Sequence, residues 1–464
     1  MKTLTPFLIG LLLMMFIVPI VSAGLFTDKA ILAYGDNTGI PKYRTLNSVL
    51  SSQQSALDTG SDVEWVEIER HPFQRQLSMI TLENPAGASD NVTFQLWNGT
   101  SWTAMARLGS DSNVSFHGID VAYESKSGRA LLVYTDNDQP TPFYRIYDGS
   151  LGGEQTAPAI NSGVVNLLTM KSNPFTNEIL MLTEDNDSDV NFYRWNGATW
   201  SAPNEIMTTA WGRSGALSIA YEQTSGNALV MYANSSSPSL LYRQWTSSNA
   251  SLSQQFVGLN MGKAPTFLQS ASNPRSNEII VAGVNKTGTT VAMVWNGTGW
   301  GNNITLSSAV LGVPAVGYEQ QSGKALVVYD DGSITLKYRV WNGTTWGSQG
   351  SVANLGDEPL WVRLASDPFS NNLAIIIGDN GNDARTYVWN GASWISFGQV
   401  LTNLFGASAR GLDVEYVMWN DTISPTFSNL IFAPPDKSYY STNTAYTFNV
   451  TITDEFYSQT TPFA

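Results

Sequence analysis

Apolar residues in this chain fall into short runs, and small polar residues separate the runs. Residues 313–350 show the pattern: "PAVGYE", "ALVVYD" and "TLKYRVW" are apolar runs, and "QQSGK" and "DGS" lie between them. Runs rich in Val and Tyr, separated by Asn, Gly and Ser, are typical of β-strands joined by hairpins. A fourth run, "WGSQGS", follows the turn "NGTT". The segment therefore predicts four antiparallel strands.

The same unit recurs along the chain, marked by a WNGxxW hairpin or a close variant of it. The first aromatic residues of these hairpins are Trp97, Tyr147, Trp195, Trp245, Trp295, Trp341 and Trp389, and subtraction gives steps of 50, 48, 50, 50, 46 and 48 residues. No step contains a convincing helical pattern. Because side chains alternate along a strand, both aromatic residues of a hairpin should share one sheet face. Four strands in a unit of this length is typical of a β-propeller blade.

Two kinds of unit alternate strictly. One kind turns between its first two strands with Ser-Gly, as in "YEQTSGNALVMY" from residue 221, and we call it the Ser-Gly blade. The other kind turns with proline, as in "SNPFTNEI" from residue 172, and we call it the proline blade. The full period is therefore a pair of blades.

The two ends of the repeat region complete each other. Residues 27–36, "TDKAILAYGD", match a second strand, and residues 411–416, "GLDVEY", match a first strand. We expect these fragments to form one shared blade with the C-terminal strand innermost, which would close the ring and remove unpaired edges. The prediction for residues 24–420 is an all-β, eight-bladed β-propeller of four-stranded antiparallel blades.

The flanking segments predict a secreted or cell-surface protein. Residues 1–23 have a charged start, an apolar core and the small residues Val21, Ser22 and Ala23, which is the pattern of a signal peptide. No other segment is apolar enough to predict a membrane span. Residues 421–464 resemble the start of an immunoglobulin-like β-sandwich, shorter than such a domain. We therefore expect further C-terminal domains in a longer parent protein.

Composition excludes several classes of function. The net charge is −14, with 24 basic and 38 acidic residues, so nucleic acid is not an expected partner. The chain has no Cys and only two His, which excludes disulfides, thiolate metal sites and a multi-histidine metal centre. A secreted chain without cysteine favours a prokaryotic surface protein, and the density of sequons described below is typical of an archaeal one. No cofactor is predicted apart from calcium, considered below.

The WNGxxW hairpin resembles a degenerate Asp-box of sialidase-type propellers, with Asn in place of Asp. The run "DGSITLKYRVW" is similar to blades of fucose-binding lectin propellers. Each resemblance covers one hairpin and implies a propeller fold. It implies no particular function, because function depends on sites and not on the fold.

The tryptophans divide into repeated and unrepeated ones. Repetition in every hairpin favours blade-to-blade packing over sugar stacking. A sugar site would more readily use tryptophans that occur in one blade type only, and the candidates are Trp65, Trp211 and Trp361.

Acidic loops follow several second strands. Asp is an ordinary turn residue, and the competing interpretation is calcium binding by clustered oxygens. The candidate ligands are Asp136, Asp138, Asp185, Asp187, Asp189, Asp330, Asp331, Asp379 and Asp383.

Twelve Asn-x-Ser/Thr sequons on a predicted secreted chain suggest glycosylation, although chance and turn chemistry also produce them. They lie at Asn91, Asn98, Asn113, Asn186, Asn234, Asn249, Asn285, Asn296, Asn303, Asn342, Asn420 and Asn449.

Catalysis is not predicted. Arginine recurs after tyrosine in the third strand of five blades, and a repeated residue favours a structural ion pair or turn cap over an asymmetric catalytic site. The arginines are Arg44, Arg145, Arg194, Arg243 and Arg339, and the expected partners are Glu124, Glu222 and Glu319. No assembled acid–base constellation is visible.

The sequence thus predicts a non-catalytic extracellular binding or adhesion module for a protein or glycan ligand. A multivalent carbohydrate-binding lectin propeller is the second hypothesis, and it would have several equivalent sites. A sialidase-like, glycan-processing hydrolase is the third, and it would have one asymmetric pocket with converging carboxylates.

Overall fold

The computed structural model describes residues 29–85, 90–210, 215–308, 310, 312–404, 410–417, 426–432, 448–453 and 458–463. Eight four-stranded antiparallel sheets form the blades of a propeller, and one of them carries a short additional strand. The described residues form no helix that could cross a membrane.

The four proline blades each run in chain order from an inner to an outer strand. Their strands are β4 (Asp62–Arg70), β5 (Leu77–Asn84), β6 (Asp90–Trp97) and β7 (Trp102–Ser112); β12 (Val165–Ser172), β13 (Ile179–Asp185), β14 (Val190–Trp195) and β15 (Asn204–Met207); β21 (Pro265–Ser272), β22 (Ile279–Asn285), β23 (Thr290–Trp295) and β24 (Trp300–Ser307); and β29 (Pro359–Ser366), β30 (Leu373–Asp379), β31 (Ala384–Trp389) and β32 (Trp394–Leu401).

The three complete Ser-Gly blades alternate with them. Their strands are β8 (Ile119–Tyr123), β9 (Ala130–Tyr134), β10 (Phe143–Tyr147) and β11 (Gln155–Thr156); β16 (Leu217–Tyr221), β17 (Ala228–Tyr232), β18 (Ser239–Thr246), β19 (Ser251–Leu252) and β20 (Phe256–Asn260); and β25 (Ala315–Tyr318), β26 (Ala325–Tyr329), β27 (Thr335–Trp341) and β28 (Gly350–Asn354).

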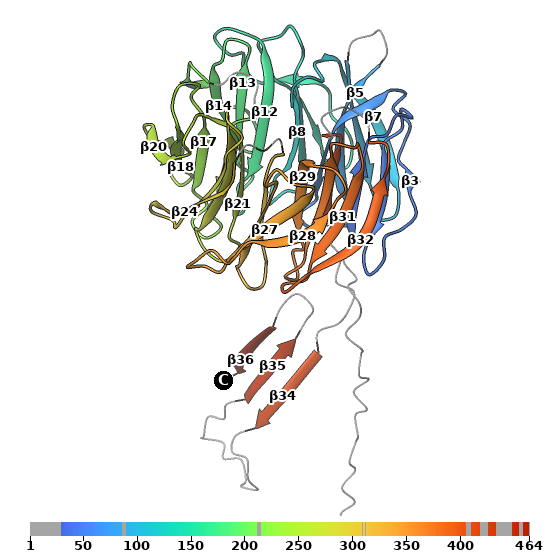
Figure 1. The fold of residues 1–464 in the computed structure, drawn as a ribbon, viewed down its shortest axis with the longest axis vertical. Coiled ribbons are helices and arrows are strands. Elements are labelled where there is room, and N and C mark those ends of the chain that lie inside the picture. Colours follow the sequence, from blue (N-terminus) through green and yellow to red (C-terminus); the bar gives the residue numbers. More distant parts are fainter. Residues whose placement is uncertain are drawn as a thin grey trace, which may run out of the picture.

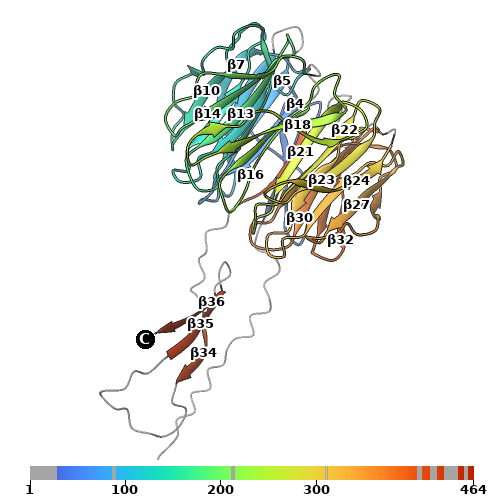
Figure 2. The ribbon, with the colours of Figure 1, turned by 90° about the vertical axis from the view of Figure 1, so that its left-hand side faces the viewer.

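The eighth blade joins the two ends of the repeat region, as predicted. Its order is β3 (Gln54–Ser55), β2 (Lys42–Leu46), β1 (Ala30–Tyr34) and β33 (Leu412–Tyr416), with β33 antiparallel to β1 and Ala30 opposite Tyr416. The innermost strands contact one another in the sequence β33, β4, β8, β12, β16, β21, β25, β29 and back to β33. Figures 1 and 2 show the propeller from two sides, with the C-terminal sheet apart from the blades. The closed ring and the innermost place of β33 are therefore confirmed.

Residues after 425 form a separate antiparallel sheet of β34 (Thr426–Phe432), β35 (Phe448–Thr453) and β36 (Ser458–Phe463). Its membership of an immunoglobulin-like domain stays a prediction. The predicted signal peptide, residues 1–23, lies outside the described residues.

The WNGxxW hairpin has a four-residue loop. Trp341 pairs with Trp346 across the hairpin and their ring centroids are 5.3 Å apart, so both lie on one sheet face as expected. Asn342 Oδ1 accepts the backbone N–H of Thr344 and Thr345, both at 2.9 Å. Among the four loop residues, only Gly343 has a positive φ, of 93°. Asparagine therefore caps the turn with its side chain, and glycine provides the left-handed residue.

Candidate functional site

The repeated hairpin tryptophans pack between blades. In β14, Trp195 is fully buried, and its Nε1 donates to Glu124 Oε1 of the preceding blade at 2.6 Å. Tyr144, also from the preceding blade, meets the Trp195 ring edge-on at 5.8 Å. Trp295 and Trp389 donate in the same way to Glu222 and Glu319. These tryptophans hold neighbouring sheets together, so their faces are not free to bind a sugar.

The expected partners of the recurrent arginines were wrong. Glu124, Glu222 and Glu319 accept the indole N–H groups just described, so they satisfy tryptophans of the next blade. The arginines reach outward instead: Arg44, Arg243 and Arg339 donate to the backbone carbonyls of the fourth-strand segment at 2.7–3.1 Å. Arg194 pairs with Glu178 at 2.8 Å, and Arg145 lies 3.9 Å from Glu154. Four of the five therefore tie the outer edge of a blade to its third strand, whereas Arg194 pairs with a glutamate in the turn before the second strand.

The acidic-loop aspartates shape their own turns. Asp185 Oδ1 accepts the N–H groups of Asp187 and Asp189, both at 2.9 Å, and Asp379 Oδ1 accepts those of Gly381 and Asp383. Burial raises the pKa of Asp185 to about 6. Within the described ranges, no group of three or more His, Asp or Glu side chains is placed to hold a metal ion.

The other aspartates proposed as calcium ligands also make hydrogen bonds or ion pairs with residues nearby in the sequence. Asp330 Oδ1 accepts the Gly332 N–H, Asp331 lies 3.6 Å from Lys337, Asp383 lies 3.2 Å from Arg385, and Asp138 accepts from Gln139. Asp136 Oδ1 accepts the Asp138 N–H at 3.4 Å. Calcium binding stays a prediction.

The sequons differ in exposure. Asn91 and Asn285 are buried, and Asn285 Nδ2 donates to the Met261 carbonyl at 2.7 Å. Asn113 and Asn234 are partly buried, Asn420 lies outside the described residues, and Asn449 lies on β35. The exposed ones are Asn98, Asn186, Asn249, Asn296, Asn303 and Asn342. Occupancy of the sequons stays a prediction.

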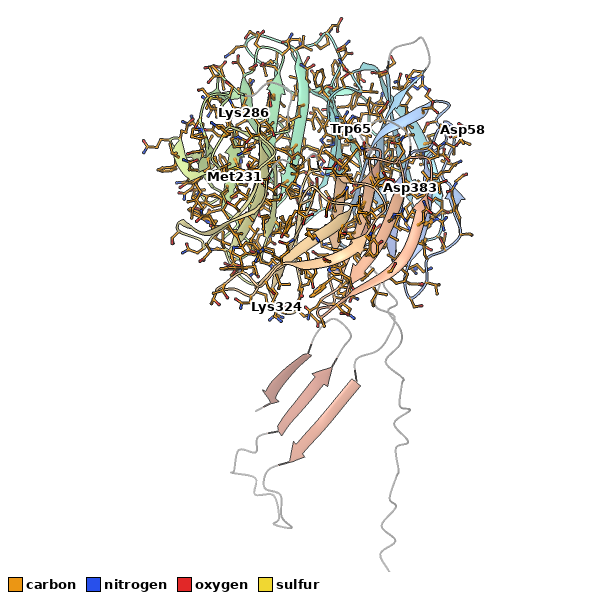
Figure 3. All side chains as sticks on the ribbon, in the orientation of Figure 1. Asp58, Trp65, Met231, Lys286, Lys324 and Asp383 are labelled. Atoms are coloured by element: carbon orange, nitrogen blue, oxygen red, sulfur yellow. The ribbon has the colours of Figure 1, made fainter. Side chains whose placement is uncertain are left out.

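A cavity of about 650 Å³ lies inside the ring, and we call it the central cavity. The first strands of several blades line it, together with blade connections such as Ser115–His117 and the second-to-third-strand loop at Lys286. In Figure 3, Trp65 and Lys286 lie toward the upper end of the propeller, whereas Lys324, in a first-to-second-strand turn, lies at the lower end. The cavity therefore lies toward the end that carries the connections and the second-to-third-strand loops. None of the nine candidate aspartates is among the described residues that line it.

Two of the three unrepeated tryptophans meet in the central cavity, and Trp211 lies outside the described residues. Trp65 and Trp361 come from β4 and β29, and their ring centroids are 5.7 Å apart. Phe267, from β21, lies edge-on to Trp361 at 5.5 Å. Trp65 is 4% exposed and donates from Nε1 to the Val114 carbonyl, whereas Trp361 and Phe267 are only partly buried. The structure thus brings three aromatic rings from separate blades to one place.

Charged residues lie next to this aromatic group. Glu67 pairs with the Arg363 guanidinium, and His117 Nε2 lies 2.7 Å from Glu67 Oε1. Arg363 also lies 4.0 Å from Asp413 of β33. Arg410 stacks over the Trp65 ring at 4.5 Å. The first strands therefore supply an ionic layer beside the aromatic one.

Burial and mutual repulsion raise the pKa values of the carboxyls, and neighbouring cations lower them. Burial raises the pKa of Glu69 to about 7, with Glu415 adding to the effect, and burial together with Glu67 raises that of Asp120 to about 6. Burial acts the same way on Glu67, but Arg363 and His117 outweigh it and lower its pKa. Lys171 projects among these carboxyls, and Glu69 and Asp120 raise its pKa against the effect of burial. The central cavity therefore holds acids that differ in ionisation near neutral pH.

Sequence reasoning missed the ionic layer and Phe267. A signal was present, because one first-strand position reads Trp65, Leu167, Phe267 and Trp361 in the four proline blades, and the position two residues later reads Glu67, Thr169, Gln269 and Arg363. All eight line the central cavity. Variation at equivalent positions of a repeat, in contrast to the constant hairpins, marks the inner face as the asymmetric part of the molecule.

No model of a known protein family matches this sequence, and no curated protein matches it. Solved structures do: the BP39L lectin of Burkholderia pseudomallei aligns with a TM-score of 0.55 and 11% identity, over 73% of this chain and all of that one. A lectin of Aleuria aurantia aligns with a TM-score of 0.38 and 12% identity over 63% and 99%, and the NanB sialidase of Streptococcus pneumoniae with 0.39 and 11% over 70% and 67%. Only the first TM-score is above 0.5, and at such identities likeness shows the fold alone. The chain is an eight-bladed β-propeller with lectin propellers among its structural neighbours.

Proposed function

We propose that the propeller binds a carbohydrate in its central cavity. The observation that carries the proposal is the meeting of Trp65, Phe267 and Trp361 in the wall of one asymmetric cavity, because aromatic faces stack on sugar rings and two of these rings, Phe267 and Trp361, are only partly buried. The lectin propeller among the structural neighbours supports this proposal over a general adhesion role. A secreted or cell-surface location suits it and rests on the predicted signal peptide.

Polar groups in the wall supply hydrogen bonds for sugar hydroxyls. Trp361 Nε1 and Gln269 Oε1 have no hydrogen-bond partner among the described residues. Lining groups of both signs, such as Glu67 and Lys171, can accept from and donate to a polyol. The volume of the central cavity lies within the range of small-ligand sites, about 300–1,000 Å³. One site per chain is proposed here, in place of the several equivalent sites of the multivalent lectin hypothesis.

Replacing Trp361 with Ala should weaken glycan binding by about tenfold to hundredfold, because a partly exposed stacking face and an indole N–H are both removed. A glycan array with the full chain would identify the sugar, and calorimetric titration of that sugar would measure the change. The hairpin variant Trp346→Ala is the matched control and should bind as tightly as the parent. Equal binding by Trp361→Ala and the parent would exclude the central cavity as the sugar site.

Glycoside hydrolysis is a second candidate, and one observation favours it. Glu67, Glu69 and Asp120 line a single asymmetric cavity, which is the arrangement expected of an enzyme. One ionised carboxylate beside a protonated one is what acid-assisted glycoside cleavage needs. The lowered pKa of Glu67 and the raised pKa of Glu69 suit these two roles.

A panel of aryl glycosides would test hydrolysis, with release of the aryl group as the readout. Under this candidate, Glu69→Gln should reduce turnover by about a hundredfold or more while sugar binding persists, since a general acid contributes about 10²–10⁴ in rate. Binding of a sugar without turnover of its aryl glycoside would leave the propeller as a binding protein.

A further inference from the structure

A second pocket lies where the ring closes, between the shared blade and the blade β29–β32, and we call this junction the closing seam. The pocket has a volume of about 520 Å³. Its walls come from the β2 hairpin turn, including Val49 and Leu50, and from β31 and β32, including Val388 and Phe397. It shares no lining residue with the central cavity.

The corresponding junctions elsewhere in the ring are filled by an aromatic side chain. Two residues after the third-strand arginine, the complete Ser-Gly blades carry Tyr147, Trp245 or Trp341. Trp245 is 3% exposed, packs 5.4 Å from Phe192 of the preceding blade, and donates from Nε1 to Glu178 Oε1 at 2.9 Å. Trp341 is 1% exposed. An aromatic ring, an indole in two of the three cases, is thus the ordinary occupant of this junction.

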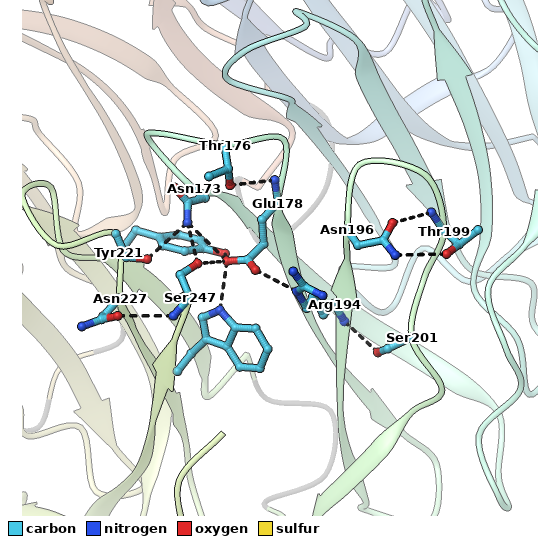
Figure 4. Close-up of polar contacts among 12 residues, drawn as sticks. Asn173, Thr176, Glu178, Arg194, Asn196, Thr199, Ser201, Tyr221, Asn227 and Ser247 are labelled. Carbon is cyan, nitrogen blue, oxygen red and sulfur yellow. Dashed lines mark hydrogen bonds and ion pairs between the residues drawn. The ribbon is translucent and has the colours of Figure 1, made fainter. Parts of the chain in front are cut away.

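Figure 4 shows the hydrogen bonds and the ion pair that the Glu178 carboxylate makes at its junction. Glu178 also pairs with Arg194 of its own blade, and it accepts hydrogen bonds from Tyr221 and Ser247 of the next blade (Figure 4). Arg194 lies over the Trp245 ring at 5.7 Å. The acceptor Glu178, the cation Arg194 and the Trp245 ring therefore all contact one another.

At the closing seam, a different residue stands at each of these three positions. Leu46, which is 2% exposed, stands where the other Ser-Gly blades have an aromatic ring. Asn372 stands in place of Glu178, as the match of "SDPFSNNL" with "SNPFTNEI" shows. Strand register places Val388 at the position of Arg194, and the other two proline blades also have an apolar residue there, Leu96 or Val294.

Leu46 packs in a buried cluster with Val388 and Tyr416 and is not one of the residues that line the pocket. The pocket is lined instead by Asn372 and Val388, whose equivalents Glu178 and Arg194 contact the Trp245 indole, so it lies where that ring would reach.

The wall of the pocket also contains a polar group. Asn372 is 7% exposed and lines the pocket together with Tyr416. Its side-chain amide is therefore placed to accept a hydrogen bond from a ligand, as Glu178 accepts one from Trp245. At the rim, Val49 is 66% exposed and Ile395 is 40% exposed, although both are large and apolar.

We propose that the closing seam binds a small molecule that carries an indole or phenol ring. The ring would occupy the place of the Trp245 indole, and its N–H or O–H would donate to Asn372 Oδ1 as Trp245 Nε1 donates to Glu178. The volume fits a small-molecule site, and the apolar wall with one polar group fits an aromatic ring with one donor. This site is separate from the proposed sugar site, so neither proposal depends on the other.

Calorimetric titration of the full chain with indole should give saturable binding of one molecule per chain, and indole should raise the melting temperature. In Leu46→Trp the protein's own indole fills the space, so binding should be lost while the melting temperature without ligand stays equal or rises. N-methylindole, which lacks the donor, should bind the parent at least about tenfold more weakly, since an unpaired buried acceptor remains. Absence of saturable binding to the parent, or unchanged binding by Leu46→Trp, would overturn the proposal.

Trp245→Leu provides the matched gain-of-site control, because it should open the same space at another junction and raise the stoichiometry to two. If that variant does not fold, Asn372→Leu tests the acceptor directly and should weaken indole binding while leaving N-methylindole nearly unaffected. Equal losses for both ligands would show that Asn372 is not the acceptor. Binding of a tryptophan-containing peptide without binding of free indole would contradict the small-molecule assignment.

Discussion

Truncation of the chain after residue 409 should abolish the cooperative melting of the propeller. The truncated chain lacks β33, which is the innermost strand of the shared blade and pairs with β1 over five residues. Leu412, Val414 and Tyr416 are each at most 5% exposed, and burying such a side chain contributes about 1.5–3 kcal/mol. Their combined loss is comparable to a typical total stability of about 5–15 kcal/mol.

The strand also carries polar contacts with β4. Asp413 Oδ2 accepts the Ile68 N–H at 2.9 Å, and Glu415 pairs with Arg70 at 3.0 Å. Without β33, the edge of β1 would be unpaired and would present a template for aggregation.

Truncation after residue 417 is the control for this experiment, because it retains β33 and removes only the segment that follows. Circular dichroism melts and size-exclusion chromatography of both chains would measure the difference. A chain ending at residue 409 that stays monomeric and melts like the one ending at 417 would contradict closure by β33.

Ring closure was predictable because the repeat is visible in the sequence. "GLDVEY" reads like "GIDVAY", so a first strand without its blade could be matched to a second strand at the other end of the chain. The structure places Leu412 opposite Tyr34, as that match requires. The blades of this one chain can be aligned with one another, so an incomplete blade can be recognised by comparison with the complete ones.

Which residues meet in the central cavity was harder to predict from the sequence. Trp65 and Trp361 could be singled out because they break the repeat, but their approach to within 5.7 Å depends on how far the ring closes. The pair Glu67–Arg363 joins residues 296 positions apart, and nothing in either local sequence indicates its partner. Such contacts follow from blade number and blade tilt, which are properties of the whole ring.

At the closing seam, too, one feature can be predicted from the sequence and another only from the structure. "YRTLNSVL" differs from "YRIYDGSL" at the position of Leu46, so the missing aromatic ring can be read from the sequence. That Asn372 and Val388 line the pocket at this junction depends on the neighbouring blade, which only the structure provides. The recurrent glutamates illustrate the opposite error, because spacing within one blade suggested an arginine partner and the partner proved to be a tryptophan of the next blade.

Replacing Trp195 with Ala should reduce the free energy of unfolding by about 3–5 kcal/mol. The indole is fully buried between two blades, 5.5 Å from the Trp200 ring and 5.8 Å from the Tyr144 ring, and its removal leaves a cavity. The substitution also removes the N–H that Glu124 accepts at 2.6 Å, which leaves that buried carboxylate with fewer donors.

Two further variants separate these contributions, with urea denaturation as the measurement. Trp195→Phe keeps most of the ring and loses only the donor, so it should cost about 1–3 kcal/mol. Trp346→Ala removes an indole from the same kind of hairpin, but that side chain is only partly buried and donates to a backbone carbonyl, that of Asn302, at the surface. Its cost should therefore be smaller, below about 2 kcal/mol. If Trp346→Ala were as destabilising as Trp195→Ala, burial between blades would not be what the repeated indoles contribute, and the hairpin turn itself would have to be the source of their effect.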